Sequence, residues 1–341
     1  MGTVAAVNSA EPTPPAPAGL TVADLTEDEL LARIFPLLPR GAATLLGPGD
    51  DAAVVAVPDG RMVVSTDVLV EGRHFRRDWS TGHDVGWRAA MQNLADIAAM
   101  GGRPTSLVVT LVAPSDLPVD WVTGLSAGLA AACDPHGVGV VGGDLSGGDL
   151  IVVSVTVHGE LDGRAPVLRS GAREGDVVAH AGVRGWSAAG LALLAAGRPE
   201  IAPELVRAYL RPDPPLAAGV AAGRAGATSM LDLSDGLLRD AGRVARASGV
   251  VLDLDPVAVS FATDLVALTD AATALGALAE DWVLAGGEDH GLLATFPAGV
   301  VLPAPFRAVG RVRAVGSAGP GVLVGGRTPA TASPGWDHFA R

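Results

Sequence analysis

Residues 82–102 read GHDVGWRAAMQNLADIAAMGG, and this stretch predicts a long helix that ends at two glycines. Its apolar residues recur at helical spacing: Val85, Ala89, Ala90, Leu94, Ile97 and Ala98. Asp96 lies among them, so we expect its carboxylate to be partly buried and to need a partner. Because the chain has no lysine and few arginines near Asp96, a hard divalent cation such as Mg²⁺ is the simplest partner.

Strand-like and helical segments alternate on both sides of this stretch, in two blocks. In the first block we expect strands at 61–67, 105–113, 138–141 and 150–157 and a further helix at 118–134. In the second block we expect strands at 176–180, 228–233 and 250–254 and helices at 186–196, 236–248 and about 262–285. The pattern predicts an α/β protein with mixed sheets and three parts: a disordered Pro/Ala-rich leader (1–20), an N-terminal domain (21–163) and a C-terminal domain (164–341).

The composition excludes several classes of protein. A chain of 341 residues, of which 49% are hydrophobic, has enough material for two packed domains. The absence of lysine excludes a P-loop, a protein-kinase lysine and a Schiff-base enzyme, and the net charge of −13 argues against nucleic-acid binding. The single cysteine, Cys133, excludes an intrachain disulfide and a cysteine-cluster zinc site. We expect a cytoplasmic protein without a membrane span, because the sequence has neither a signal-peptide pattern nor a long apolar run.

Acidic residues gather at the ends of apolar strands and beside glycines, not on charged helix faces. Six motifs share this placement: Gly49-Asp50-Asp51, Ser65-Thr66-Asp67, Asn93-Leu94-Ala95-Asp96, Gly142-Gly143-Asp144, Asp232-Leu233-Ser234-Asp235-Gly236 and Gly286-Gly287-Glu288-Asp289. A strand that ends at an aspartate places a carboxylate at the rim of its sheet, where ligands of α/β proteins bind. Any one motif alone is more typical of a turn or a helix N-cap, so the interpretation depends on all six.

Clustered carboxylates suit an anionic substrate only if metal ions lie between them. Several Mg²⁺ ions would invert the local field and bridge phosphate oxygens. Phosphoryl transfer needs mainly positioning and charge neutralisation, so an ATP site without lysine is physically reasonable. Gly143 and the glycines around it would let the backbone approach a phosphate closely. Arg169 is a candidate phosphate contact, with a surface ion pair as its alternative.

The chain resembles the thiamine-monophosphate kinase family over about residues 22–339. Eight motifs occur in the family's order: GDDAAV, STDVLVEGRHF, NLADIAAMGG, VVGGDLSGG, LRSGAREGD, LDLSDGL, GGEDHGL and GWDHF. The family shares a superfamily with aminoimidazole-ribonucleotide synthetase, selenophosphate synthetase and a hydrogenase-maturation protein. The resemblance implies a two-domain α/β subunit with the synthetase-like fold, whose N-terminal domains pair in a homodimer. It also implies the Mg²⁺-dependent reaction ATP + thiamine phosphate → ADP + thiamine diphosphate.

The resemblance further implies a role for each matching position. The metal ligands, direct or through water, would be Asp51, Ser65, Thr66, Asp67, Asp96, Asp144, Asp232 and Asp235. The ATP contacts would be Gly143, Asp144, Arg169 and Ser234, and the contacts to thiamine phosphate would be His74, Glu288 and Trp336. The alternatives are a packed strand-end histidine for His74 and a hydrophobic plug for Trp336. Since the acceptor is already an ionised phosphate, we expect direct in-line transfer without a catalytic base.

The chain differs from the usual family pattern in two motifs. The family often has GGEDYEL where this chain has His290-Gly291, and GGDTT where this chain has Leu145-Ser146. The second change puts the polar surroundings of Asp144 in doubt, though not Asp144 itself. Two alternatives remain: another ATP-dependent enzyme of the superfamily, of the ring-closing synthetase type, or an inactive metal-binding homodimer.

Overall fold

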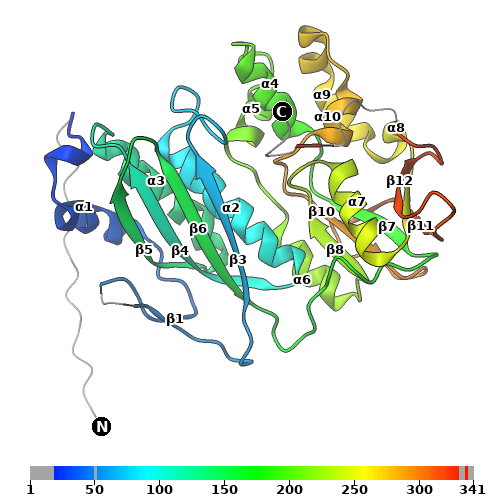
Figure 1. Cartoon of the computed structure of the whole chain (residues 1–341), viewed down its shortest axis with the longest axis horizontal. Helices are drawn as coiled ribbons and strands as arrows, with labels where there is room; N and C mark the ends of the chain where they lie inside the picture. Colours follow the sequence, from blue (N-terminus) through cyan, green and yellow to red (C-terminus); the bar gives the residue numbers. More distant parts are fainter. Residues whose placement is uncertain (1–18, 50–51, 330–334, 337–341) are drawn as a thin grey trace.

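The structure is a computed structural model that describes residues 19–49, 52–329 and 335–336. Two sheets divide it into an N-terminal and a C-terminal half, which Figure 1 shows side by side. Helices α2 (Gly82–Ala99) and α6 (Leu216–Arg224) pack on each other where the halves meet. Each half has its own hydrophobic core, and a third, smaller cluster includes residues of both helices at the junction. The expected α/β class with mixed sheets is confirmed.

The N-terminal sheet has the strand order β3–β6–β4–β5. Its strands are β3 (Val63–Val70), β6 (Val152–Glu160), β4 (Arg103–Ala113) and β5 (Gly139–Gly147). Only β4 and β5 run parallel. Side chains alternate along β3, so that Ser65 and Asp67 face α2 while Val64 and Thr66 face the other way and are exposed. One face of the sheet is therefore covered by helices, and the described residues leave the other face partly open.

Helix α2 fits closely against α3 (Val119–Cys133) because glycines line its contact. A Cβ atom on Gly86 would lie 2.0 Å from the carbonyl oxygen of Leu125, so only glycine allows this approach. A capping box of Thr81 and Asp84 begins α2, which runs to Ala99 close to the predicted end. The sequence therefore fixes the position and length of the helix that carries Asp96.

The C-terminal sheet has the strand order β12–β9–β11–β7–β10–β8. Its strands are β7 (Val177–Ala181), β8 (Ser229–Asp232), β9 (Val251–Leu254), β10 (Leu292–Phe296), β11 (Arg307–Arg313) and β12 (Gly321–Val324). The helices around it are α4 (Trp186–Ala195), α5 (Pro203–Leu210), α7 (Leu237–Ser248), α8 (Val257–Ser260), α9 (Ala262–Leu275) and α10 (Ala279–Ala285). The edge strand β8 contacts α2, which brings the end of this sheet to the N-terminal half.

Most predicted elements are confirmed to within a few residues. Helices α5 and α6 have no counterpart in the sequence prediction, and the helical stretch expected at 262–285 is two helices. It breaks at Gly276, whose φ of +62° is left-handed and ends α9.

The first described segment contains helix α1 (Glu27–Ile34), which begins at the predicted Thr26–Glu29 capping box. Pro36 lies in the short 3₁₀ turn Phe35–Leu37 that follows. The remaining elements are the turns Val22–Asp24 and Asp134–His136 and the hairpin of β1 (Thr44–Leu46) and β2 (Val54–Val55). In the described part of the chain, no single helix is long and apolar enough to cross a membrane, and only the sharply bent pair α9–α10 passes that test jointly.

Candidate active site

Three carboxylates from three elements lie close together where the halves meet. Asp67 comes from β3, Asp96 from α2 and Asp232 from the end of β8. We call them the acid group. The pKa of Asp67 is raised to about 6 and that of Asp96 to about 7. Burial is the main cause, the charge of Asp232 acts in the same direction, and His290 opposes the rise. Ser65 donates a hydrogen bond of 2.6 Å to Asp96, so this predicted ligand also lies in the group.

The acid group fits a hard cation. Its members offer carboxylate oxygens that repel one another, and no ion pair among the described residues joins Asp67 or Asp96 to an arginine. Among the described residues, no group of three or more His, Cys, Asp or Glu side chains is arranged to hold a metal ion without other ligands. That agrees with the habits of Mg²⁺, which usually takes one or two carboxylates and completes its shell with water and substrate phosphates. Asp51 lies outside the described residues.

Asp235 lies in the β8–α7 loop beside the acid group and adds to the negative field at Asp67. Unlike Asp67 and Asp96, it is paired with an arginine, because Arg243 donates to its Oδ2 at 2.5 Å. The backbone of Asp235 and Gly236 donates to the buried Asp240, which fixes the loop at the start of α7. Ser234, a predicted ATP contact, accepts a hydrogen bond from the backbone of Glu288.

Two predicted metal ligands point away from the acid group. The Thr66 hydroxyl donates to the Val155 carbonyl and lies on the open face of the N-terminal sheet. Asp144 on β5 is exposed and pairs in register with Thr110, on that same face. Alternation of side chains along a strand separates them from Asp67, so this chain does not bring them together with it. Their role as ligands stays a prediction.

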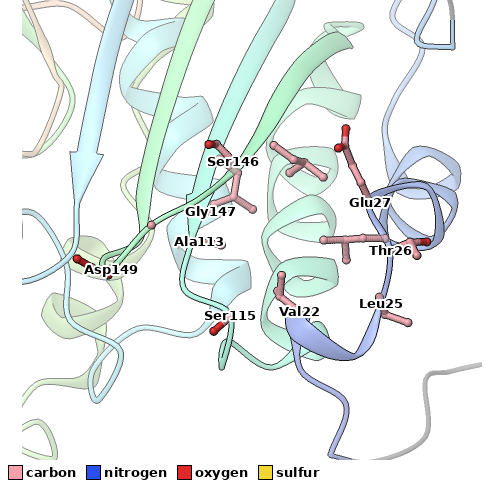
Figure 2. A pocket seen from close by; sticks show the side chains of 13 residues that line it. Val22, Leu25, Thr26, Glu27, Ala113, Ser115, Ser146, Gly147 and Asp149 are labelled. Carbon is pink, nitrogen blue, oxygen red and sulfur yellow. The ribbon is translucent and has the colours of Figure 1, made fainter.

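A pocket of about 430 Å³ lies at the end of β5 and is lined by residues 145–149, though not by Asp144 itself. Figure 2 shows Thr26 and Glu27 on one of its sides and Ser146 and Gly147 on the other. Apolar side chains make up much of its wall: Val22, Leu25, Leu30, Leu111 and Leu145. Next to it on β5, a Cβ atom on Gly143 would lie 1.9 Å from the Val109 carbonyl oxygen, which explains glycine at this predicted ATP contact.

The loop before β10 carries Glu288 and His290 in a left-handed backbone conformation, with φ of +70° and +52°. Asp289 between them holds the loop in place. Its carboxylate accepts hydrogen bonds from the backbone of Gly185 and Ser187 at the start of α4, at 2.6 and 2.8 Å. His290 Nδ1 lies 3.1 Å from Asp232 Oδ2, so the loop reaches the acid group.

The other predicted contacts are dispersed around this site. The backbone N–H of Trp336 donates to the Asp235 carbonyl, which places this residue at the β8–α7 loop, and Trp336 is 54% exposed. His74 Nδ1 accepts a hydrogen bond from the Val70 backbone. Arg169 is exposed, and its carbonyl accepts a hydrogen bond from Ser248. Among the described residues, the structure records no contact between Arg169 and the acid group.

Sequence reasoning missed Arg88 and the structural role of Asp289. Arg88 is an arginine in the apolar stretch that decides the fold, two turns before Asp96, and that placement was a usable signal of burial. It pairs with Glu288 from the other half of the molecule. Asp289 belongs to the acidic motif at 286–289, but its structural role had no signal, because its partners lie about a hundred residues away along the chain.

The sequence has close relatives of known name. A thiamine-monophosphate kinase from Mycobacterium tuberculosis is 49% identical over 94% of this chain and 93% of the relative. The chain belongs to the thiamine-monophosphate kinase family. A kinase of the same name from Corynebacterium glutamicum is 42% identical, over 94% of this chain and 96% of its own. The family model for the AIR synthase related protein, N-terminal domain, matches residues 49–161. The family resemblance of the eight motifs is therefore confirmed.

Solved structures agree with the sequence relatives. One described as AaThiL complexed with AMPPCP and TMP superposes with a TM-score of 0.74 at 34% identity, covering 85% of this chain and 91% of that one. The thiamine-monophosphate kinase from Stenotrophomonas maltophilia gives 0.73 at 31% identity, covering 88% and 95%. The hydrogenase maturation protein HypE, at 18% identity and a TM-score of 0.63 over 81% and 84%, shares the fold. The expected synthetase-like superfamily fold is confirmed.

Proposed function

We propose that the chain transfers the terminal phosphoryl group of ATP to thiamine phosphate and so makes thiamine diphosphate. The observation that carries this is the 34% identity, over most of both chains, with a structure that holds AMPPCP and TMP. The names of the relatives support the same reaction. The acid group supports it chemically, because it lies where β3, α2 and β8 meet and has the oxygen donors that a metal-bound polyphosphate requires.

The acid group would hold Mg²⁺, with Ser65 and the nearby Asp235 as further oxygen donors. When bound, Mg²⁺ supplies neutralisation of the charge on phosphate oxygens. The protein itself fixes the donors on regular elements, since Asp96 lies in the last turn of the largely buried helix α2 and Asp67 in the central part of β3. Thiamine phosphate already carries an ionised nucleophile, so no residue needs to remove a proton, and direct in-line transfer follows.

The pocket beside β5 is the proposed site of the adenine base. Its apolar wall suits a flat heterocycle, and its lining residue Leu145 directly follows the predicted ATP contacts Gly143 and Asp144 on β5. Arg169 and Ser234 remain proposed ATP contacts. Asp144 and Thr66 would serve phosphate-bound metal from the open face of the sheet.

The substrate side of the site would be formed by Glu288, Trp336 and His74. The Trp336 ring would stack on the pyrimidine or thiazolium of thiamine phosphate, and Glu288 would accept a hydrogen bond from its amino group or face its cation. The boundary between an N-terminal domain ending at 163 and a C-terminal domain starting at 164 also stays a proposal, as does a cytoplasmic location.

A homodimer would cover the open face of the N-terminal sheet. Val64 and Val68 are 56% and 45% exposed on that face, and Val108 and Val152 are only partly buried there. An apolar, β-branched sheet face of this kind commonly marks a protein interface. The expected pairing of N-terminal domains would bury these valines and bring Thr66 and Asp144 close to the partner.

Mass spectrometry of the products from ATP, Mg²⁺ and either thiamine phosphate or free thiamine tests the function. We expect phosphorylation of thiamine phosphate and little of thiamine. Equal or exclusive use of thiamine would contradict the proposal. ATP hydrolysis or ring closure without thiamine diphosphate would indicate the synthetase alternative, and no nucleotide turnover with any acceptor would indicate an inactive homodimer.

A further inference from the structure

Arg88 is a buried cation for which the proposed phosphoryl transfer has no use. It is 3% exposed in the middle of α2, and its guanidinium donates a hydrogen bond to Glu288 of the C-terminal half. A charged side chain is rarely buried without a partner, because the free energy needed to remove it from water exceeds what most contacts in the protein recover. The pairing therefore calls for an explanation in terms of what Glu288 does.

The two members of the pair differ in their access to a ligand. The side chain of Arg88 is 4% exposed and that of Glu288 is 35% exposed. Both contacts that the structure gives to the Glu288 carboxylate involve Oε2, one from Arg88 Nη2 and one from His290 Nε2 at 3.9 Å. A ligand can therefore reach Glu288 but not Arg88, and any influence of Arg88 on that ligand passes through Glu288.

Arg88 is itself held in place by Tyr209 of α5. The guanidinium carbon lies 4.6 Å from the centre of the tyrosine ring, and Nη1 donates to the Tyr209 carbonyl at 3.5 Å. The Tyr209 hydroxyl donates to the carbonyl of His74 at 3.3 Å. The Arg88–Tyr209 pair thus contacts Glu288 from one half and His74 from the other, the two proposed substrate contacts.

We propose that Arg88, stacked on Tyr209, is a positioning residue that fixes Glu288 relative to His74 and so sets the affinity for the thiamine end of the acceptor. The inference rests on the proposed function. A planar guanidinium is required because it must face the ring and reach the carboxylate at once, which the point charge of a lysine cannot do. The acid group lies on the other side of His290, so binding of ATP should not depend on Arg88.

Steady-state kinetics of the full chain test this with Arg88→Met, Arg88→Lys, Glu288→Gln and the double variant R88M/E288Q. We expect Arg88→Met to raise KM for thiamine phosphate about tenfold and to leave KM for ATP within about twofold. Arg88→Lys should restore only part of the loss. The double variant should be no worse than the poorer single one, because both remove the same contact.

Arg211→Met is the matched control. Arg211 also joins the C-terminal half to α2, through Asp84, but its side chain is 40% exposed and this ion pair does not involve Glu288. It should leave both KM values unchanged. If circular dichroism shows that Arg88→Met is unfolded, Arg88→Lys and Tyr209→Phe decide, with a raised KM for thiamine phosphate expected in each.

Unchanged KM for thiamine phosphate, an equal rise for both substrates, or additive effects in the double variant would overturn the inference. An inactive wild-type chain would refute the proposed function and the inference with it. An active wild type with unaffected Arg88 variants would refute the inference alone.

Discussion

Two clusters of buried acids differ in their partners. In the C-terminal half, Asp289 lies 3.2 Å from Arg184, and Asp264 lies 2.9 Å from Arg307. Backbone N–H groups complete the shell of Asp289 and donate to Asp264 as well. In the acid group, by contrast, the carboxylates face one another. Burial raises the pKa of acids in both clusters, but only in the first do arginines oppose the rise.

The difference distinguishes buried acids that stabilise the fold from buried acids that are available to bind a ligand. A buried carboxylate with an arginine and backbone donors has its charge balanced by the fold, and its role is to hold segments together. In the acid group, Asp67 and Asp96 have no arginine partner among the described residues, and of its three members Asp232 alone pairs with His290. Carboxylates whose charges are not fully balanced destabilise the protein alone, and such strain is tolerated where a ligand relieves it. Burial by itself therefore does not mark a functional acid, whereas the lack of a cationic partner does.

We expect the largest loss of stability from a substitution among the arginine-paired acids of the C-terminal half. Asp289→Ala leaves the fully buried Arg184 without its carboxylate and removes the cap of α4, so we expect the free energy of unfolding to fall by about 3–5 kcal/mol. Urea denaturation measures this. A loss below that of Asp78→Ala, a surface control, would break the comparison.

We expect the largest loss of activity, with the fold retained, from a substitution in the acid group. Asp67→Asn removes a charge from the proposed metal site while keeping shape and burial. We expect turnover of thiamine phosphate to fall about 100-fold or more, with an unchanged circular dichroism spectrum. Steady-state assays at saturating Mg²⁺ measure it. Wild-type turnover in the variant would remove the acid group from the chemistry.

Asp96→Asn should slightly increase the stability of the protein in EDTA, whereas Asp289→Ala decreases it. The substitution relieves repulsion by Asp232 and Asp67, and the amide oxygen can still accept the hydrogen bond from Ser65. The metal-free variant should be more stable than the metal-free wild type by about 1 kcal/mol, because the charge that it removes from Asp96 forms no ion pair. Thermal unfolding in EDTA checks the sign, and destabilisation would show that Asp96 has a balancing partner.

We expect the smallest change in stability from a substitution in an exposed surface ion pair. Arg76 and Asp78 form a pair in which both side chains are more than half exposed. Arg76→Ala should leave the free energy of unfolding nearly unchanged, because solvent already screens the pair. Urea denaturation beside Asp289→Ala gives the scale of the comparison, and a loss of several kcal/mol here would show that exposure does not govern these ion pairs.

The sequence predicted elements with strong local signals and missed those that depend on distant contacts. The helix of Asp96 has regular apolar spacing, a capping box and terminal glycines, so its bounds could be predicted. Helices α5 and α6 are short and lie among prolines and glycines, where such signals are weak. Asp289 and Arg88 owe their roles to partners a hundred or more residues away, which spacing cannot show.

Within the site, strand alternation limited the prediction. The motif Ser65-Thr66-Asp67 suggests three neighbouring ligands, but a strand sends its middle residue to the opposite face. Ser65 and Asp67 accordingly lie on the α2 side, where Ser65 contacts Asp96, whereas Thr66 lies on the open face with Asp144.

The most direct test of the central claim is the effect of Mg²⁺ on thermal unfolding, measured against EDTA with the ATP analogue AMPPCP in both samples. The wild type and Asp289→Asn should gain thermal stability on addition of Mg²⁺, while Asp67→Asn and Asp96→Asn should lose most of that gain. An equal gain in the wild type and in both acid-group variants would contradict the claim that these unpaired carboxylates hold the metal.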